Sequence, residues 1–308
     1  MQLAGLLVAV LLCACSLGVT LDPATAGPVG AASGQAAPAR PMSEPRGRAY
    51  LFRGFAGLIF SLGIDQLAER IERAGFPATV NEAVMCSAVA AEAIRSYRQA
   101  PAPITVIGHS VGAACALSFA EMLSAENIPV SLVVTTDPAR ISGDVPLNVE
   151  RYIDIFQSNS LLGGRDVVPA KGFQNHYASF DLVEHNEINH LNIEKAESMH
   201  EQVVTKIEQL ATTSAKTETE TVPIKLVVPA DATLELWDSG MPVFTRASDT
   251  LQTLATLYHV PLWSLVQINR IPGSAPLAPG QRIVVPRHLL PFAAPATGAI
   301  SGQSPARH

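Results

Sequence analysis

The sequence has few of the features that tie a protein to nucleic acid or to a metal. It carries 21 Lys and Arg against 27 Asp and Glu, a formal charge of −6, without a basic block. Binding to nucleic acid through its phosphates requires such a block, so this class of partner is excluded. Its 4 cysteines and 8 histidines form no cluster with the spacing of a zinc site. We therefore expect no metal and no cofactor.

Aromatic residues are also scarce, at 6%, but hydrophobic residues make up 48% of the 308 residues. A chain of this length and composition can build about two domains with cores of their own, without help from disulfides. Two cysteines lie in the N-terminal leader, and Cys86 and Cys115 lie on apolar helical patterns. We expect these two to be free thiols that pack as small hydrophobic side chains.

The N-terminus is typical of an exported protein. Residues 3–14 form an apolar run that is too short to span a membrane comfortably, as in a signal peptide. Leu12-Cys13-Ala14-Cys15 resembles the lipobox of bacterial lipoproteins, which implies lipidation of Cys15 and a membrane anchor. Two features depart from that pattern: the run has no preceding Lys or Arg, and a cysteine stands two positions before Cys15. Secretion with cleavage near Ala26 is the alternative, and both place the protein in the cell envelope or periplasm.

The stretch after the leader has a different composition. Residues 22–46 are rich in Pro, Ala, Gly and Ser, which cannot bury enough surface to order themselves. We therefore expect residues 16–47 to form a disordered tether.

The segment Ile104–Leu123 contains the clearest chemical motif. A β-branched run is followed by Gly108-His109-Ser110-Val111-Gly112, and apolar residues then recur at helical spacing. A G-x-S-x-G motif between a strand and a helix is a nucleophile elbow, in which a sharp turn exposes the serine above the sheet. Ser110 is the expected nucleophile, and the Val111 amide at the helix N-terminus would contribute to the oxyanion hole. We expect His109 to pack or to line a pocket.

Strands and helices alternate along the first two thirds of the chain, which predicts an α/β fold with a parallel sheet and right-handed crossovers. Residues 48–210 resemble the α/β-hydrolase superfamily, in a short version without its first two strands, and this implies helices on both faces. We expect strands at 48–53, 76–80, 104–107, 129–136, 149–156 and 177–183, and helices at 64–71, 81–99 and 193–210.

The α/β-hydrolases have the chain order Ser, acid, His, and this sequence offers candidates for both partners of the serine. One candidate acid, Asp154, lies inside a strand, where the alternation of residues suggests a structural or edge role. Thr136-Asp137-Pro138-Ala139 resembles the Leu-Asp-Pro-Ala segment of pancreatic-type lipases, which implies that Asp137 is the acid. Asp166, after the following strand, is the alternative acid. His190 follows the last strand, just before the final helix, and is the expected base. His185, earlier in the same loop, is the alternative base.

The first strand ends in Arg53-Gly54-Phe55, which resembles the His-Gly-Phe turn of lipases. The resemblance implies that the Phe55 amide is the second oxyanion donor, and a plain strand-to-helix loop is the alternative. The next apolar residues either line an acyl pocket or belong to a packed helix. They are Leu58, Ile59, Phe60 and Leu62.

Residues 211–223 lack apolar periodicity and are the expected linker to a second domain at 224–290. Within it we expect Ile224–Trp237 to pair as a hairpin. Residues 241–287 resemble a lysin motif (LysM), a small βααβ domain. The resemblance implies binding to peptidoglycan or another polymer of N-acetylglucosamine. The motifs that carry the resemblance are Asp249-Thr250-Leu251, Asn269 and Leu277–Gln281, and Ser248 stands where glycine is common. After this domain, we expect residues 291–308 to form a disordered tail.

These features predict a cell-envelope serine hydrolase, a lipase-like enzyme acting on carboxylic esters, that its LysM domain localises to peptidoglycan. An inactive hydrolase-fold scaffold that binds peptidoglycan is one alternative. An envelope amidase or thioesterase with the same triad is another.

Overall fold

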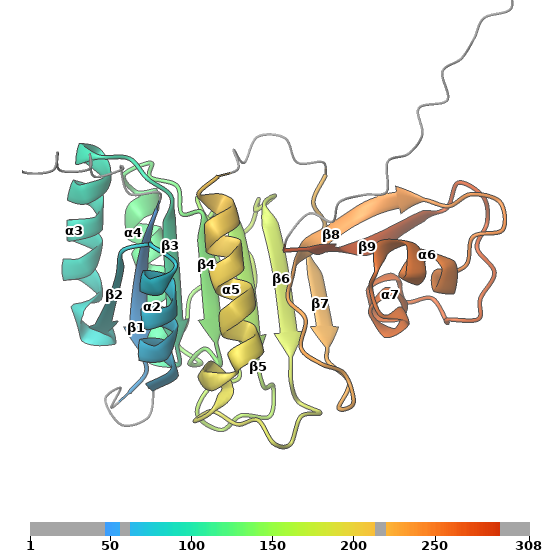
Figure 1. Cartoon of the computed structure of the whole chain (residues 1–308), viewed down its shortest axis with the longest axis horizontal. Coiled ribbons are helices and arrows are strands. Elements are labelled where there is room, and N and C mark those ends of the chain that lie inside the picture. The colour runs from blue at the N-terminus through green and yellow to red at the C-terminus, as the bar shows by residue number, and fades with distance from the viewer. Residues whose placement is uncertain (1–46, 56–61, 213–219, 290–308) are drawn as a thin grey trace, which may run out of the picture. The chain divides into compact units, whose positions relative to one another are not determined.

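The computed structural model describes residues 47–55, 62–212 and 220–289 (Figure 1). The predicted signal peptide, lipobox, tether and tail lie outside these residues, as do Leu58, Ile59 and Phe60. Within the described ranges, none of the helices is both long and apolar enough to cross a membrane.

A seven-stranded sheet forms the larger part of the described chain. All neighbouring strands are parallel, in the order β2-β1-β3-β4-β5-β6-β7. The strands are β1 (Arg48–Arg53), β2 (Ala78–Glu82), β3 (Ile104–His109), β4 (Leu132–Thr136), β5 (Arg151–Phe156), β6 (His176–Asp181) and β7 (Ile224–Val227). The predicted parallel α/β architecture is confirmed.

Helices cover both faces of this sheet. On one face α2 (Leu62–Arg73) and α5 (Glu197–Leu210) share a core with Ile107 and Ile153, and both lie in front of the strands in Figure 1. On the other face α3 (Cys86–Gln99) and α4 (Val111–Ser124) share a core with Val106 and Tyr152. These two residues directly precede Ile107 and Ile153 in their strands. Successive strand residues point to opposite faces, so nearly continuous apolar strands fill two cores.

One expectation about helices is wrong. Asn81 does not begin a helix: it lies in β2, and α3 starts at Cys86 after a short 3₁₀ turn at Ala83–Met85. The crossovers from β4 to β5 and from β5 to β6 are loops without a helix. These two loops start at the carboxyl edge of the sheet, where Asp137 and Gln157 follow their strands.

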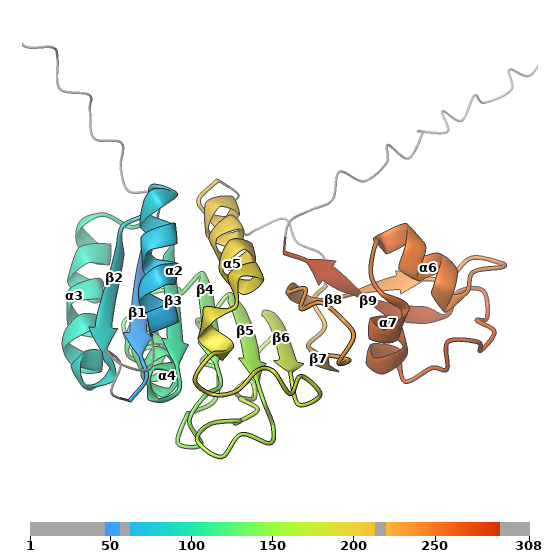
Figure 2. The same cartoon turned by 60° about the horizontal axis from the view of Figure 1, so that its bottom comes forward.

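The predicted hairpin at Ile224–Trp237 is also wrong. β7 pairs in parallel with β6 and completes the large sheet, although it follows the 211–223 segment. The C-terminal domain has one antiparallel pair, β8 (Trp237–Phe244) with β9 (Arg282–His288), and two helices, α6 (Leu251–Tyr258) and α7 (Leu262–Asn269). Figure 2 shows both helices beside this pair of strands.

A buried ion cluster joins β8 to the large sheet. The Asp238 carboxylate lies 3.2 Å from Arg151 Nε at the start of β5 and 2.9 Å from Lys206 Nζ on α5. All three side chains are at most 3% exposed. Next to them, Trp237 packs between Phe180 of β6 and Trp263 of α7. The C-terminal domain is therefore packed against the sheet by buried contacts in addition to the covalent connection.

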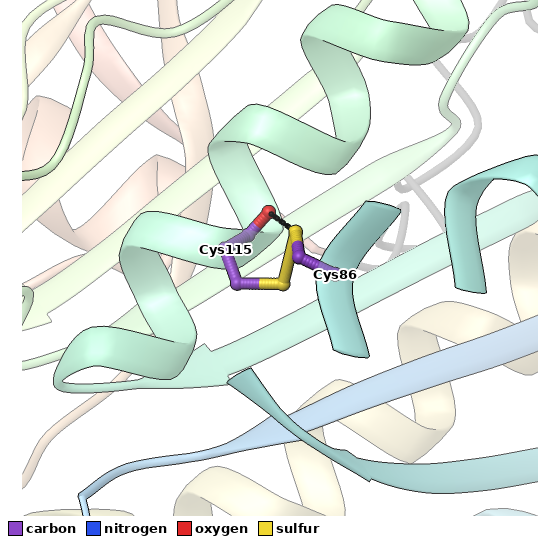
Figure 3. The surroundings of a disulfide bond; sticks show 2 residues. All are labelled: Cys86 and Cys115. Atoms are coloured by element: carbon purple, nitrogen blue, oxygen red, sulfur yellow. Dashed lines mark hydrogen bonds between the residues drawn. A yellow bond between two sulfur atoms is a disulfide. The ribbon is translucent and has the colours of Figure 1, made fainter. Parts of the chain in front are cut away.

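The two helical cysteines form a disulfide, which corrects the expectation of free thiols. Cys86 at the start of α3 and Cys115 on α4 are bonded, with Cα atoms 5.7 Å apart (Figure 3). Each cysteine lies on the apolar face of its helix, as predicted. The bond follows from the packing of these two helices against each other, which no local pattern reveals.

Candidate active site

Ser110 occupies a strained turn between β3 and α4. Its backbone has φ 57° and ψ −120°, a region that costs a non-glycine residue about 1–3 kcal/mol. The flanking glycines permit this turn: a Cβ on Gly108 would lie 2.3 Å from the Gly112 carbonyl oxygen. A Cβ on Gly112 would lie 2.2 Å from the carbonyl oxygen of Phe52. The elbow is therefore pressed against the end of β1, with its serine at the carboxyl edge of the sheet.

The carboxyl end of β4 brings Asp137 to the same place. The Ser110 amide donates to the Thr136 carbonyl at 3.0 Å, and the Ala139 amide donates to the Ser110 carbonyl at 3.1 Å. These two bonds hold the serine against the segment that carries Asp137. Sequence reasoning placed Asp137 at this edge, and the backbone contacts show how it is held beside the elbow.

Asp137 and His190 are hydrogen-bonded to each other. His190 Nδ1 lies 2.5 Å from Asp137 Oδ2, and the carboxylate is fully buried. The same carboxylate accepts hydrogen bonds from Ser160 Oγ at 2.7 Å and from the Gln157 amide at 3.2 Å. Burial alone would raise the pKa of Asp137, but these hydrogen bonds outweigh it and lower the pKa below its usual value. An ionised carboxylate accepts a hydrogen bond from the protonated Nδ1 of His190, so Nε2 carries the lone pair and can act as a base.

The His190 ring also lies beside the elbow. Its centroid is 4.8 Å from that of His109, the residue before Ser110. Among the described residues the Ser110 hydroxyl makes no hydrogen bond to His190. In ligand-free enzymes this contact is often long and shortens when substrate binds. Ser110 and Asp137 thus follow the neighbouring strands β3 and β4, and His190 is hydrogen-bonded to Asp137.

His109 contributes to the position of the loop that carries His190. Its buried ring has Nε2 at 2.9 Å from the His190 carbonyl oxygen. Burial lowers the pKa of His109 to about 4, so the ring is neutral at neutral pH. Because the carbonyl can only accept, Nε2 carries the proton and donates. The expectation that His109 packs at the site agrees with this contact, but its bond to the loop was not foreseen.

Gln157 was missed by sequence reasoning. Its Nε2, which carries two hydrogens, lies within hydrogen-bond distance of three carbonyl oxygens of the loop before His190: Leu182 at 3.3 Å, His185 at 3.1 Å and Ile188 at 2.9 Å. Its backbone amide donates to Asp137, so one residue holds both the carboxylate and the histidine loop. A lone glutamine after a strand has no motif that would have identified it.

The alternative acid, Asp166, and the alternative base, His185, make contacts with other residues. Asp166 pairs with Lys225 on β7, with 2.6 Å between carboxylate and Nζ, and it also accepts from Ser179. The His185 ring lies 2.8 Å from the Glu187 carboxylate. The structure brings neither Asp166 nor His185 into contact with the Asp137 and His190 pair.

The expected oxyanion donors lie on adjoining elements. Val111 is the first residue of α4, so its N–H belongs to the helix turn that has no intrahelical acceptor. Phe55 follows β1, whose end touches Gly112, and its side chain is 81% exposed. Leu62 is also exposed, so it does not belong to the packed core of α2. In the described ranges, no group of three His, Cys, Asp or Glu side chains could hold a metal ion.

The C-terminal domain reproduces the predicted βααβ order. Thr250 caps α6 through a capping box with Thr253. Asn269, at the end of α7, bonds through its side chain to both the amide and the carbonyl of Val284 in β9. Ser248 has φ 73°, a left-handed conformation, which explains why glycine is common at this position. The LysM family model matches residues 246–286. These residues form a LysM domain.

Some solved structures resemble about half of the chain. They include a Xanthomonas campestris pv. campestris protein assigned to the alpha/beta hydrolase superfamily, which is 16% identical and covers 54% of this chain and 96% of its own, with a TM-score of 0.32. The esterase domain of a Rhodothermus marinus protein is 15% identical over 55% of this chain and 88% of its own, with a TM-score of 0.38. Similarity at this level assigns no activity. No curated protein matches the chain. The parallel sheet, with the strained serine between β3 and α4, has the strand–serine–helix arrangement of a nucleophile elbow.

Proposed function

We propose that the protein is an exported serine hydrolase of carboxylic esters that its LysM domain holds on peptidoglycan. The observation that carries the proposal is the hydrogen bond between His190 Nδ1 and the buried Asp137 carboxylate, beside the strained Ser110. A serine hydroxyl is a weak nucleophile at neutral pH. It requires a base that removes its proton and a carboxylate that holds the base in the correct tautomer.

The proposed reaction has two steps. Ser110 Oγ attacks the acyl carbon while His190 Nε2 takes its proton, and Asp137 stabilises the resulting imidazolium. The carbonyl oxygen becomes an oxyanion that the amides of Val111 and Phe55 stabilise. His190 returns the proton to the departing alcohol, which leaves an ester on Ser110. A water molecule, deprotonated by His190, then releases the acid and restores the serine.

The disulfide supports export. Disulfides such as Cys86–Cys115 persist in oxidising compartments like the periplasm and are rare in the cytosol. An envelope location also agrees with the LysM domain, since LysM domains bind glycans that contain N-acetylglucosamine. We propose lipidation of Cys15 as the anchor, on the strength of the lipobox resemblance alone.

A panel of p-nitrophenyl esters with acyl chains of increasing length, extended to thioesters and acyl amides, tests the reaction class. We expect ester hydrolysis by the wild-type chain. Replacement of any triad member typically lowers turnover by about 10³-fold or more, so Ser110→Ala and His190→Ala should have almost no activity. Hydrolysis by Ser110→Ala at the wild-type rate would contradict the proposal. Turnover restricted to amides or thioesters would change the reaction class but keep the triad.

Co-sedimentation with insoluble peptidoglycan tests the other half of the proposal. The full chain should sediment with the wall material, and soluble oligomers of N-acetylglucosamine should release it. The full chain is needed because truncation at residue 210 would also remove β7 from the sheet. Retention that the oligomers do not reduce would refute the glycan assignment.

A further inference from the structure

The Asp137 carboxylate has a second hydrogen-bond partner on the oxygen that contacts His190. Ser160 Oγ lies 2.7 Å from Asp137 Oδ2, and His190 Nδ1 lies 2.5 Å from the same oxygen. Ser160 is 8% exposed and Asp137 is fully buried, so little water reaches this bond. Inside a protein, a hydrogen bond to an ionised carboxylate is stronger than one between two neutral groups. Ser160 therefore interacts strongly with the proposed acid, although it lies outside the proposed triad.

Ser160 is the donor in this bond. The Gly163 amide donates to Ser160 Oγ at 3.2 Å, so the hydroxyl oxygen already accepts from another side. The pKa of Asp137 lies below its usual value despite burial, which keeps the carboxylate ionised at neutral pH. An ionised carboxylate can only accept, and the hydroxyl has a single proton to give. That proton is therefore directed at Asp137 Oδ2.

A closely packed turn, residues 157–163, holds the Ser160 hydroxyl in this place. The Ser160 amide donates to the Gln157 carbonyl at 2.9 Å, and the Arg140 guanidinium donates to the Ser160 carbonyl at 3.1 Å. A Cβ on Gly163 would lie 2.6 Å from Asp137 Oδ2, so only glycine lets the turn approach the carboxylate this closely. The sequence therefore shapes this turn around the carboxylate.

The turn binds both oxygens of the carboxylate. The Gln157 amide donates to Asp137 Oδ1 at 3.2 Å, and the Ser160 hydroxyl donates to Oδ2. The terminal torsion of an aspartate has a broad energy minimum, so the plane of a carboxylate is set by its hydrogen bonds. Two donors on two oxygens fix that plane. Without the Ser160 proton, the turn would hold the carboxylate at Oδ1 alone.

We infer that Ser160 is a positioning residue of the proposed triad, whose hydroxyl holds Asp137 in the plane that aligns the His190 ring. The inference rests on the proposed function, because it assigns Ser160 a part in the same reaction. Ser160 acts through Asp137 and contacts none of the reacting atoms. An imidazole that is misaligned by a small angle removes the serine proton less efficiently, so the expected cost is in turnover and not in substrate binding.

Steady-state kinetics with a p-nitrophenyl ester provide the first test. Ser160→Ala should lower kcat about tenfold and change KM by less than about twofold, since one hydrogen bond to a charged group changes an equilibrium by about tenfold or more. Ser160→Cys has nearly the same size and keeps a weak donor, so its kcat should lie between those of wild type and Ser160→Ala. The matched control is Ser158→Ala, at an exposed position of the same turn, which should have the wild-type kcat.

A double-mutant cycle separates positioning from a general effect on the fold. Its readout is the rate at which a fluorophosphonate probe labels Ser110, which can be measured in slow variants. Ser160→Ala should lower this rate about tenfold in the otherwise wild-type chain. In a chain that carries Asp137→Ala, the same change should lower it by less than about twofold, because the group through which Ser160 acts is already missing. A residue that only stabilises the turn would lower the rate by the same factor in both chains.

The outcomes distinguish this inference from the proposed function. An active wild-type chain whose kcat is unchanged in Ser160→Ala would overturn the inference alone. Equal factors in the two backgrounds of the cycle, or an equal loss of kcat in Ser158→Ala, would also overturn it and leave the triad in place. A folded wild-type chain that neither hydrolyses esters nor reacts with the probe at Ser110 would contradict both.

Discussion

Replacement of Glu194 by glutamine should stabilise the protein above neutral pH. Glu194 lies in the 3₁₀ turn Ile193–Lys195, four residues after His190, and its side chain is fully buried. Its carboxylate is pressed against the start of α2, where a Cβ on Gly63 would lie 2.1 Å from Glu194 Oε2. Burial raises the pKa of Glu194 from 4.5 to about 7, against the weaker opposing attraction of Lys195.

The sign of the pH effect follows from this shift. Between about pH 4.5 and pH 7 the folded protein holds a proton on Glu194 that the unfolded chain has released. The free energy of unfolding therefore falls as pH rises through this window, and it does not fall further above pH 7. The pKa rise corresponds to about 3 kcal/mol, at 1.36 kcal/mol per pH unit. Glu194→Gln removes this titration. The free energy of unfolding of the variant should therefore exceed that of wild type by about 3 kcal/mol at pH 8, and the two values should be equal near pH 4.

Urea unfolding of both proteins at several pH values between 4 and 8 measures the difference, and other titrating groups cancel in it. Glu201→Gln, at an exposed position on α5, is the matched control and should leave the pH dependence unchanged. Parallel stability curves for wild type and Glu194→Gln, or a variant that is less stable at pH 8, would refute the reasoning.

Three further predictions concern the contacts that hold the fold and the site. Gln157→Ala should lower kcat about tenfold or more with little change in KM, since it loosens the histidine loop; unchanged kcat would contradict this role. Asp238→Asn removes the buried charge that pairs with Arg151 and Lys206 and should lower the free energy of unfolding by about 3–5 kcal/mol in urea titrations, unlike the exposed Asp231→Asn. Replacing Cys86 and Cys115 with alanine opens a 29-residue loop and should cost about 3–4 kcal/mol; an unfolding midpoint equal to that of the oxidised wild type would exclude a stabilising bond.

The sequence predicts the parts of this fold that local patterns specify. The β-branched run before Gly108 and the helical spacing after Gly112 are local features, and the elbow has the predicted form. Strand starts differ by up to three residues, as at β4, where the predicted strand begins at 129 and the observed one at Leu132. The predicted helix does not begin at residue 81 because an edge strand continues through Asn81 before the chain turns into α3.

Contacts between segments that are distant in the sequence could not be predicted from local patterns. β7 has only four residues, and its partner β6 lies more than forty residues earlier, so nothing local distinguishes it from a hairpin strand. The Cys86–Cys115 bond and the contacts of Gln157 depend likewise on packing between remote elements. Asp137 and Asp166 both follow strands of one sheet, and only the folded loops show that the first of them meets His190.

Active-site labelling with a fluorophosphonate probe tests the central claim most directly. The probe reacts only with a serine that a neighbouring base activates, and mass spectrometry of the digested protein identifies the modified residue. We predict one adduct, on Ser110, whose rate of formation falls about a hundredfold or more in His190→Ala. A wild-type chain that is folded but unlabelled, or labelled at another serine, would contradict it.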